Sequence, residues 1–333
     1  MLQLHLMQGL TPDKPILTVD LGGTKIATAL ISDGYQIIGR QYAATVADEG
    51  PDAVVRRMLN VINATLASAE VDCPSFSTVA LASAGIIDVK EGIVTASPSL
   101  PGWHNIPLRE MVERETGLEC FLINDATAAV AAEHQLGVGK GLRNLLYVTV
   151  STGIGGGIIV DGNLYSGTSG CAGEVGHMII EANGPPCNCG NAGCLESLAS
   201  GGAVAREARR RIASGENSLV LELAEGEPQN ITAETVSAAA ERGDSLSLEI
   251  ISQTATYLGI GMANLVNIFN PEMIIIGGGL SKMGDMLFDP LRRTVAERAF
   301  PLPIGSVQIV PSQLGDDVSL LGAAFCLMKS KGL

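Results

Sequence analysis

The stretch ILTVDLGGTKIATALISDGYQIIG, residues 16–39, carries the pattern that decides the fold. Its β-rich runs surround a glycine pair and are joined at Asp33-Gly34, a dipeptide typical of a tight turn between antiparallel strands. The same order of strand, glycine loop, strand and Asp-Gly turn returns in LLYVTVSTGIGGGIIVDGNLYSG, residues 145–167. A shift of 128 residues pairs Thr24 with Thr152, Asp33 with Asp161 and Gly34 with Gly162. Self-similarity over so long a period predicts two related domains rather than a short-period repeat.

The rest of the chain alternates between apolar runs and amphipathic segments, which indicates an α/β fold. Strands are expected at 77–83, 120–125 and 273–281, and helices at 52–70, 107–117, 198–214, 232–242 and 317–329. A longer helix precedes Asn270-Pro271, a pair that should end it. No low-complexity linker separates the halves. Two duplicated α/β domains joined in this way usually face each other across a ligand-binding cleft.

The composition is that of a compact globular protein. The 333 residues are 46% hydrophobic and 17% charged, enough for two well-buried cores. A net charge of −14 argues against a general nucleic-acid surface, which needs a basic footprint. The sequence contains no run of 18 consecutive apolar residues, so we expect no membrane span. The first 15 residues lack a basic leader, so we expect no signal peptide, and the seven cysteines then indicate a reducing, cytoplasmic compartment.

Three glycine loops follow predicted strands: DLGGTK (20–25), STGIGGG (151–157) and GGGLS (277–281). Glycines let the backbone approach a ligand closely and leave amide groups free to bind anionic oxygens. None of the loops fits the P-loop or GxGxxG pattern, and each alone is more typical of a tight turn. Three of them at strand ends in a duplicated chain favour a nucleotide. Asp20, which ends the first strand, either caps the turn or holds a magnesium ion.

A separate cluster of metal-binding residues has the spacing H-x9-C-x-C-x4-C and consists of His177, Cys187, Cys189 and Cys194. Four such ligands within a short stretch suit tetrahedral zinc. Disulfides are the weaker alternative, because three cysteines cannot all pair locally. A catalytic zinc is also disfavoured, since four protein ligands leave no position for water. The count of ligands therefore predicts a closed, structural zinc.

Taken together, these motifs resemble the sugar-kinase family named for its repressors, open reading frames and kinases (ROK), within the actin-like ATPase superfamily. The resemblance runs from about Ile16 to Met328 and rests on DLGGTK, IND, STGIGGGII, GEVGH and GPPCNCGNAGCLES in that order. It implies an α/β fold of two duplicated actin-like (ribonuclease H-like) domains flanking a cleft, and a homodimer. The expected domains are 1–124 joined by the C-terminal helix (about 317–333), and 125–316 with a zinc loop at 177–194.

The resemblance also implies roles for individual residues. DLGGTK would contact the β- and γ-phosphates of ATP, with Asp20 near the magnesium; STGIGG would be a second phosphate loop, and the third loop would lie against the adenosine. The nucleotide-binding residues implied are Asp20, Gly22, Gly23, Thr24, Lys25, Thr152, Gly153, Gly277, Gly278 and Gly279.

The resemblance identifies Asp125 as the general base that takes the proton of the attacking sugar hydroxyl. Out of context, an aspartate between a strand and a helix would be read as a helix cap. The residues implied to bind the sugar are Asn124, Asp125, Glu174, His177 and Glu196. His177 would give one ring nitrogen to zinc and the other to the sugar.

Two segments depart from the family pattern. SPSLPGW (97–103) has Ser99 where asparagine is usual, and ASAGIID (82–88) lacks the usual proline before Gly85. Trp103 in the first segment is expected to be a core residue. Both segments should lie near the sugar, so they leave the hexose open.

Among function classes, ATP-dependent phosphorylation of glucose at its 6-hydroxyl comes first. Phosphorylation of an N-acetylhexosamine such as N-acetylmannosamine comes second. A sugar-responsive repressor is disfavoured, because relatives of that kind carry an N-terminal helix-turn-helix domain for which Asp20 leaves no room. A sugar-binding module without activity is disfavoured because Asp20, Asp125 and all three glycine loops occur together.

Overall fold

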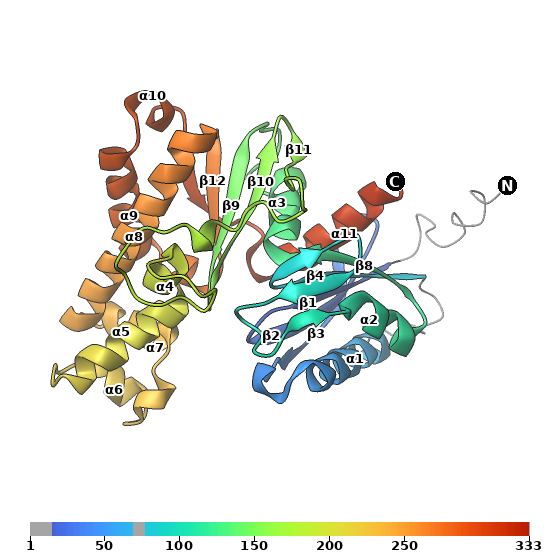
Figure 1. Ribbon diagram of the computed structural model, residues 1–333, viewed down its shortest axis with the longest axis horizontal. Coiled ribbons are helices and arrows are strands. Elements are labelled where there is room, and N and C mark those ends of the chain that lie inside the picture. Colours follow the sequence, from blue (N-terminus) through green and yellow to red (C-terminus); the bar gives the residue numbers. More distant parts are fainter. Residues whose placement is uncertain (1–14, 69–76, 333) are drawn as a thin grey trace. The chain divides into compact units, whose positions relative to one another are not determined.

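The computed structural model describes residues 15–68 and 77–332, which fold into two compact units (Figure 1). Unit 1 comprises the described residues up to Lys140, residues 164–172 and the chain from Asp316 onward; unit 2 comprises 141–163 and 173–315. The sequence placed the boundary after residue 124, whereas the units divide after residue 140. Helix α3 (Asp125–Gln135) therefore belongs to unit 1. Residues 1–14 and the last two residues of the helix predicted at 52–70 lie outside the described part.

Unit 1 is built on a five-stranded sheet of order β3-β2-β1-β4-β8. Strands β1, β2 and β3 pair antiparallel, while β1, β4 and β8 run parallel to one another. The strand bounds are β1 Ile16–Leu21, β2 Lys25–Ile31, β3 Ile37–Ala44, β4 Thr78–Ser83 and β8 Glu119–Asn124.

Unit 2 repeats this architecture in a second five-stranded sheet of order β11-β10-β9-β12-β13. Its strands are β9 Leu145–Val150, β10 Ile154–Val160, β11 Asn163–Leu164, β12 Met273–Gly277 and β13 Gln308–Pro311. As in unit 1, the first strand pairs antiparallel with the second and parallel with the fourth. The matching order and direction of the strands confirm the duplication.

The period of the duplication differs by one residue between strands and turns. The first two strands of each sheet begin 129 residues apart, whereas the Asp-Gly turns are 128 residues apart. In the second hairpin Asp161 and Gly162 both have positive φ, 51° and 77°, as a two-residue turn between twisted strands requires. In the first hairpin the positive φ falls on Tyr35 instead, and five residues (32–36) separate the strands rather than two (161–162).

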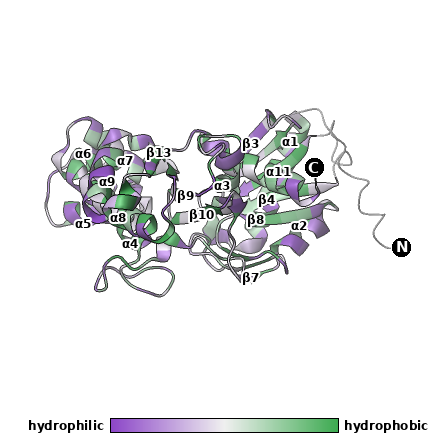
Figure 2. Cartoon of the chain, turned by 90° about the horizontal axis from the view of Figure 1, so that it is seen from above, coloured by the Kyte–Doolittle hydropathy of each residue, from purple (hydrophilic) through white to green (hydrophobic). Residues whose placement is uncertain are grey.

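Helices cover both faces of the unit 1 sheet (Figure 1). Helices α1 (Pro51–Ser68) and α2 (Leu108–Thr116) share one apolar core with the sheet, and α2, largely polar, is mostly purple in Figure 2. Helix α11 (Val318–Ser330) packs against β1, β4 and α3. Gly322 permits this close packing, because a Cβ there would overlap the carbonyl of Ala128.

Sequence analysis missed a small three-stranded sheet of order β5-β6-β7, which lies between β4 and α2 in the chain. Its strands are too short for a periodic pattern: Ile86–Asp88, Ile93–Ala96 and His104–Ile106. Trp103, directly before its last strand, is fully buried in the unit 1 core, which confirms the predicted core role.

Unit 2 is mostly helical around its sheet. The long helix α8 (Ser245–Phe269) ends at Asn270, whose φ of 45° is left-handed, directly before Pro271 as predicted. The other helices are α4 Leu195–Ala199, α5 Gly201–Ala213, α6 Leu219–Leu223, α7 Ala233–Glu241, α9 Asp285–Arg298 and α10 Pro301–Ile304. Short 3-10 turns in the chain are Ala47–Glu49, Val175–His177, Pro228–Asn230, Gly279–Met283 and Gly315–Asp317. Among the described residues, no helix is both long and apolar enough to cross a membrane.

Asp244 caps the long helix and holds it to the start of α6. Its carboxylate accepts hydrogen bonds from the Ser247 amide (2.9 Å) and hydroxyl (2.7 Å), the Leu219 amide (2.9 Å) and the Ser218 hydroxyl (2.9 Å). Burial alone would raise the pKa of Asp244, but these hydrogen bonds hold it below its ordinary value of 3.8. The charged form is thus favoured in the folded state.

We predict that Asp244→Ala lowers the free energy of unfolding of the protein by about 2 kcal/mol, measured by denaturant unfolding at pH 7. Because the folded pKa lies below the unfolded one, this contribution is present above about pH 4 and is lost as pH falls further. Asp285→Ala, at an exposed aspartate in the first turn of α9, is the control and should cost less than about 1 kcal/mol. Equal losses for both variants would contradict the prediction.

Candidate functional site

The parallel strands of unit 1 bring two predicted carboxylates to one edge of the sheet. Asp20 in β1 pairs with Ala82 in β4, and Ala82 pairs with Ile123 in β8. Asp20 is therefore level with the residue that precedes Asn124, at the carboxyl ends of three parallel strands. Ligands of open α/β sheets commonly bind at such strand ends. Asp125 follows two residues after Ile123, and its charge raises the pKa of Asp20. Two acidic residues predicted from separate motifs therefore lie near the same strand ends.

The electrostatics of Asp20 suit a cation. The pKa of Asp20 is raised from its ordinary 3.8 to about 7. Burial is the largest cause; the nearby carboxylate of Asp125 also raises the pKa, Lys25 lowers it, and Asp317 raises it. A carboxyl group crowded by like charges is stabilised in its ionised form by a bound cation. Oxygen ligands of this kind are those that magnesium prefers. The residues present therefore fit a magnesium ion at Asp20.

The first glycine loop joins β1 to β2. The Gly22 amide donates to the Lys25 carbonyl (3.0 Å), which closes the loop. Gly23 lies against Ser99, where a Cβ would come within 2.6 Å of the Ser99 carbonyl oxygen, so only glycine fits. Thr24 and Lys25 are exposed to solvent. The loop has the close packing on one side and the exposed backbone on the other that a phosphate-binding loop needs.

Asn124, and not Asp125, caps helix α3. The Asn124 side-chain oxygen accepts from the Thr127 amide (2.9 Å), and its amide nitrogen donates to the Gly85 carbonyl (3.2 Å). Asp125 is the first residue of the helix, where Oδ1 accepts from the Ala126 amide (2.8 Å). The interpretation of Asp125 as a mere cap is therefore wrong, because Asn124 takes that place. The Asn124 nitrogen carries two hydrogens and can donate the second to a ligand.

The second glycine loop, Ser151–Gly153, joins β9 to β10 in unit 2 and is held by the start of α4 and α5. The Glu196 oxygen Oε2 accepts from the Ile154 amide (2.8 Å), and the Gly201 amide donates to the Ser151 carbonyl (2.7 Å). A Cβ at Gly153 would come within 2.5 Å of the same Glu196 oxygen. Glu196 thus hydrogen-bonds Ile154, the residue directly after Thr152 and Gly153 of this loop.

The third glycine loop follows β12. A Cβ at Gly277 would overlap the Tyr147 hydroxyl. Gly278 has a φ of 84°, and a Cβ there would overlap the carbonyl oxygen of Val150. Gly279 faces open space, since no atom lies within 4 Å of where its Cβ would stand. The first two glycines are therefore required by packing within unit 2, and the third leaves room for a ligand.

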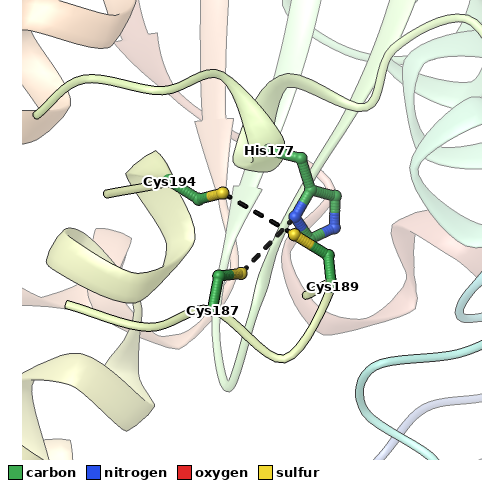
Figure 3. A group of neighbouring side chains, drawn as sticks. All are labelled: His177, Cys187, Cys189 and Cys194. Atoms are coloured by element: carbon green, nitrogen blue, oxygen red, sulfur yellow. Dashed lines mark hydrogen bonds between the residues drawn. The ribbon is translucent and has the colours of Figure 1, made fainter. Parts of the chain in front are cut away.

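The four predicted metal ligands meet in one place (Figure 3). Their ligand atoms all lie within 4.8 Å of one another. The Cys189 and Cys194 sulfurs are 3.7 Å apart, and the Cys187 sulfur is 3.7 Å from His177 Nδ1. Tetrahedral zinc with Zn–S bonds of about 2.3 Å requires sulfurs about 3.8 Å apart. His177, Cys187, Cys189 and Cys194 thus form a Cys3His cluster that can hold a metal ion, and its spacing fits zinc.

The two ring nitrogens of His177 have different neighbours. While Nδ1 points into the cluster, Nε2 lies 3.9 Å from Oε2 of Glu174. Partial burial raises the pKa of Glu174, the His177 ring lowers it, and the charge of Glu196 raises it. Glu174, His177 and Glu196 therefore stand close enough to influence one another electrostatically. They form an acidic patch beside the metal cluster that can accept hydrogen bonds from hydroxyl groups.

Comparison with known proteins identifies the family. The ROK family model matches residues 16–330. The chain belongs to the ROK family. It is 38% identical over 322 residues to a glucokinase of Thermotoga maritima, covering 96% of this chain and 99% of the relative. A ROK glucokinase of Streptomyces griseus, solved with glucose and AMPPNP, superposes with a TM-score of 0.84 at 31% identity over 94% of this chain and 98% of that one.

A third similar protein is a candidate N-acetylmannosamine kinase of Listeria monocytogenes. It superposes with a TM-score of 0.76 at 26% identity, covering 95% of this chain and 99% of the other. These neighbours agree with the two-domain actin-like ATPase fold seen in the paired sheets.

Sequence reasoning missed residues that hold the site from a distance. The Tyr257 hydroxyl in α8 donates to Glu181 (3.1 Å), whose backbone amide and that of Ile180 donate to the Gly193 carbonyl of the zinc loop. Neither residue belongs to a motif, and the two are 76 positions apart in the chain. No local pattern could have found this contact, because it depends on how α8 packs.

We predict that the purified protein carries about one zinc ion per chain, and that Cys194→Ser abolishes this zinc. Loss of one of four ligands opens the tetrahedral shell and lowers the affinity steeply. Cys171→Ser is the matched control: Cys171 lies outside the cluster, so this variant should keep its zinc. Elemental analysis by mass spectrometry measures the ratio of zinc to protein chain. If Cys194→Ser retained its zinc, the assignment of the Cys3His cluster as the zinc site would be wrong.

Proposed function

We propose that this protein transfers the terminal phosphoryl group of ATP to the 6-hydroxyl of a hexose, with glucose as the first candidate. The single observation that carries the proposal is the sheet register that brings Asp20, beside the first glycine loop, level with the β8–α3 junction that holds Asp125. Membership of the ROK family, with glucokinase relatives over nearly the whole chain, supports sugar phosphorylation.

In this proposal the glycine loops bind the phosphates of ATP. Amide groups of residues 22–25 and of Thr152 and Gly153 face phosphate oxygens, and the third loop, Gly277–Gly279, lies against the adenosine. A magnesium ion at Asp20 would neutralise charge on the phosphates. Phosphoryl transfer depends mostly on such positioning and charge neutralisation, since little other chemistry is required of the protein.

Asp125 is proposed as the general base. The hydrogen bond from the Ala126 amide to Oδ1 fixes the carboxylate at the first turn of α3, where the helix dipole stabilises negative charge. The carboxylate would accept the proton of the sugar hydroxyl as the phosphoryl group is transferred. Asn124, whose cap interaction orients it, would donate its second amide hydrogen to the same sugar.

Glu174, His177 and Glu196 are proposed to bind the other hydroxyls of the sugar. Structural zinc in the Cys3His cluster would fix the ring of His177 through Nδ1, which leaves Nε2 for a hydroxyl group. Hydroxyl donors from a bound sugar would lower the raised pKa of Glu174, because hydrogen bonds to a carboxylate favour its charged form.

We also propose that the protein forms the homodimer implied by the family and that it is located in the cytoplasm.

A kinase of N-acetylhexosamines is the second candidate. Ser99 stands where the family usually has asparagine, and its hydroxyl lies 3.3 Å from that of Ser97. The shorter side chain leaves more room for a substituent than asparagine would. The Listeria neighbour agrees with this alternative.

We predict that ADP release coupled to sugar phosphorylation is fastest with glucose when glucose, mannose, fructose, glucosamine and N-acetylated hexosamines are compared by kcat/KM. A pocket built to hydrogen-bond the sugar should separate good from poor substrates by a large factor. Preference for N-acetylmannosamine would establish the second candidate instead. Absence of phosphorylation of every sugar would refute the proposed function.

We predict that Asp125→Asn lowers kcat by about 10²–10⁴-fold while nucleotide affinity and thermal stability stay near wild type. Asparagine keeps an oxygen for the Ala126 amide but cannot take a proton. Asp52→Asn, at an exposed aspartate in the first turn of α1, is the control and should leave kcat unchanged. Near-normal turnover of Asp125→Asn would remove Asp125 from the role of base.

A further inference from the structure

Thr45, the residue after β3, is fully buried and touches the first glycine loop twice. Its hydroxyl donates to the Gly22 carbonyl (2.7 Å), and its backbone amide donates to the Thr24 carbonyl (2.9 Å). No motif in the sequence includes Thr45. A buried side chain that ends on the backbone of a ligand loop fixes the conformation of that loop, since breaking the bond would leave a buried polar group unpaired.

Thr45 is itself held from behind. Arg57 in α1 donates Nη1 to the Thr45 carbonyl (2.6 Å), and its other terminal nitrogen pairs with Glu49. The amide, the carbonyl and the hydroxyl of Thr45 are thus all engaged within unit 1. A residue tied at three points can transmit the rigidity of the helix and sheet to the loop it contacts.

The hydroxyl of Thr45 controls the orientation of one particular peptide group. Gly22 and Gly23 share a trans peptide plane, in which the carbonyl and the next amide point in opposite directions. With the Gly22 carbonyl turned to Thr45, the Gly23 amide must point away from Thr45. Peptides between two glycines rotate easily, because neither residue has a Cβ to restrict its dihedral angles. The Thr45 hydroxyl therefore opposes a flip of this peptide.

Other contacts fix the neighbouring parts of the loop, so the Gly22–Gly23 peptide is the part that can still rotate. Lys25 is already placed by β2 and by Tyr42 of β3, whose ring centroid lies 4.8 Å from the Lys25 ammonium nitrogen. Gly23 is confined by Ser99, against which any added Cβ would clash. The direction of the Gly23 amide is then set mainly by the bond between Thr45 and Gly22.

We propose that Thr45 is a positioning residue for nucleotide binding: its hydroxyl holds the Gly22–Gly23 peptide so that the Gly23 amide faces the phosphates. The inference rests on the proposed function in taking residues 22–25 as a phosphate loop. It concerns the polyphosphate alone, so the affinity for adenosine and for sugar is independent of it.

Isosteric removal of the hydroxyl tests this role. Thr45→Val should raise the dissociation constant of magnesium-AMPPNP about tenfold in calorimetry without sugar, because a buried carbonyl loses its donor and the peptide can flip. Thr45→Ser, which keeps the hydroxyl, should stay within about threefold of wild type. Adenosine, followed by ligand-observed NMR, should bind all variants equally.

Thr18→Val is the matched control. Thr18 is equally buried in β1, and its hydroxyl donates to the Ala29 carbonyl (3.2 Å), away from the glycine loop. It should lose thermal stability comparable to Thr45→Val yet keep its AMPPNP affinity within about twofold. Should Thr45→Val fail to fold, Thr45→Ala removes the same hydroxyl without placing a methyl group against Gly22.

The results separate this inference from the proposed function. Unchanged AMPPNP affinity in the variant without the hydroxyl, equal weakening by Thr18→Val, or equal loss of adenosine binding would overturn the role of Thr45. Wild type that binds no AMPPNP would overturn it too. Selective loss of AMPPNP binding in a protein that phosphorylates no sugar would support the role of Thr45 while refuting the proposed function.

Discussion

Parallel pairing of β1, β4 and β8 is the constraint on which the rest of the site depends. The buried faces of these strands must meet the apolar faces of the helices on either side, so their register cannot slip without exposing a whole row of side chains. That register brings Asp20 level with the end of β8. The carboxylates of Asp20 and Asp125, from distant parts of the chain, are thereby brought close together. The favourable packing of the sheet offsets the free energy of their repulsion.

Like charges brought together in this way need a counter-charge. The pKa of Asp20, raised to about 7 by burial and then by Asp125, records that cost. Lys25, at the end of the first glycine loop, offsets part of it, and a divalent cation would offset more. An arrangement that disfavours the ionised form of Asp20 on its own therefore favours binding of a cation beside it.

The zinc loop solves a different problem. Residues 177–194 contain few large apolar side chains, so burial alone cannot order them, and a metal ion held by the Cys3His cluster would supply the missing constraint. Glu174 and Glu196 lie three residues before the first ligand and two residues after the last. Ordering the loop thus orders both glutamates, and Glu196 passes that order on to the second glycine loop through the Ile154 amide.

The sequence by itself determined the features that are written in short stretches. The pattern of strand, glycine loop and turn predicted the duplication, and the spacing of one histidine and three cysteines predicted the Cys3His cluster. Asn270-Pro271 predicted the end of α8. These features are local, because turn geometry and ligand count depend on neighbouring residues. The short strands β5 to β7 escaped the same reasoning, because three or four residues carry no clear period.

Only the tertiary structure decided what depends on residues far apart in the chain. It assigned α3 to unit 1, made Asn124 rather than Asp125 the cap, and brought Thr45 to Gly22 and Glu196 to Ile154. Each of these contacts joins a side chain to a backbone group or an element whose position is set by packing. Hydrogen bonds of that kind leave no periodic pattern in the sequence, since almost any residue can supply the backbone partner.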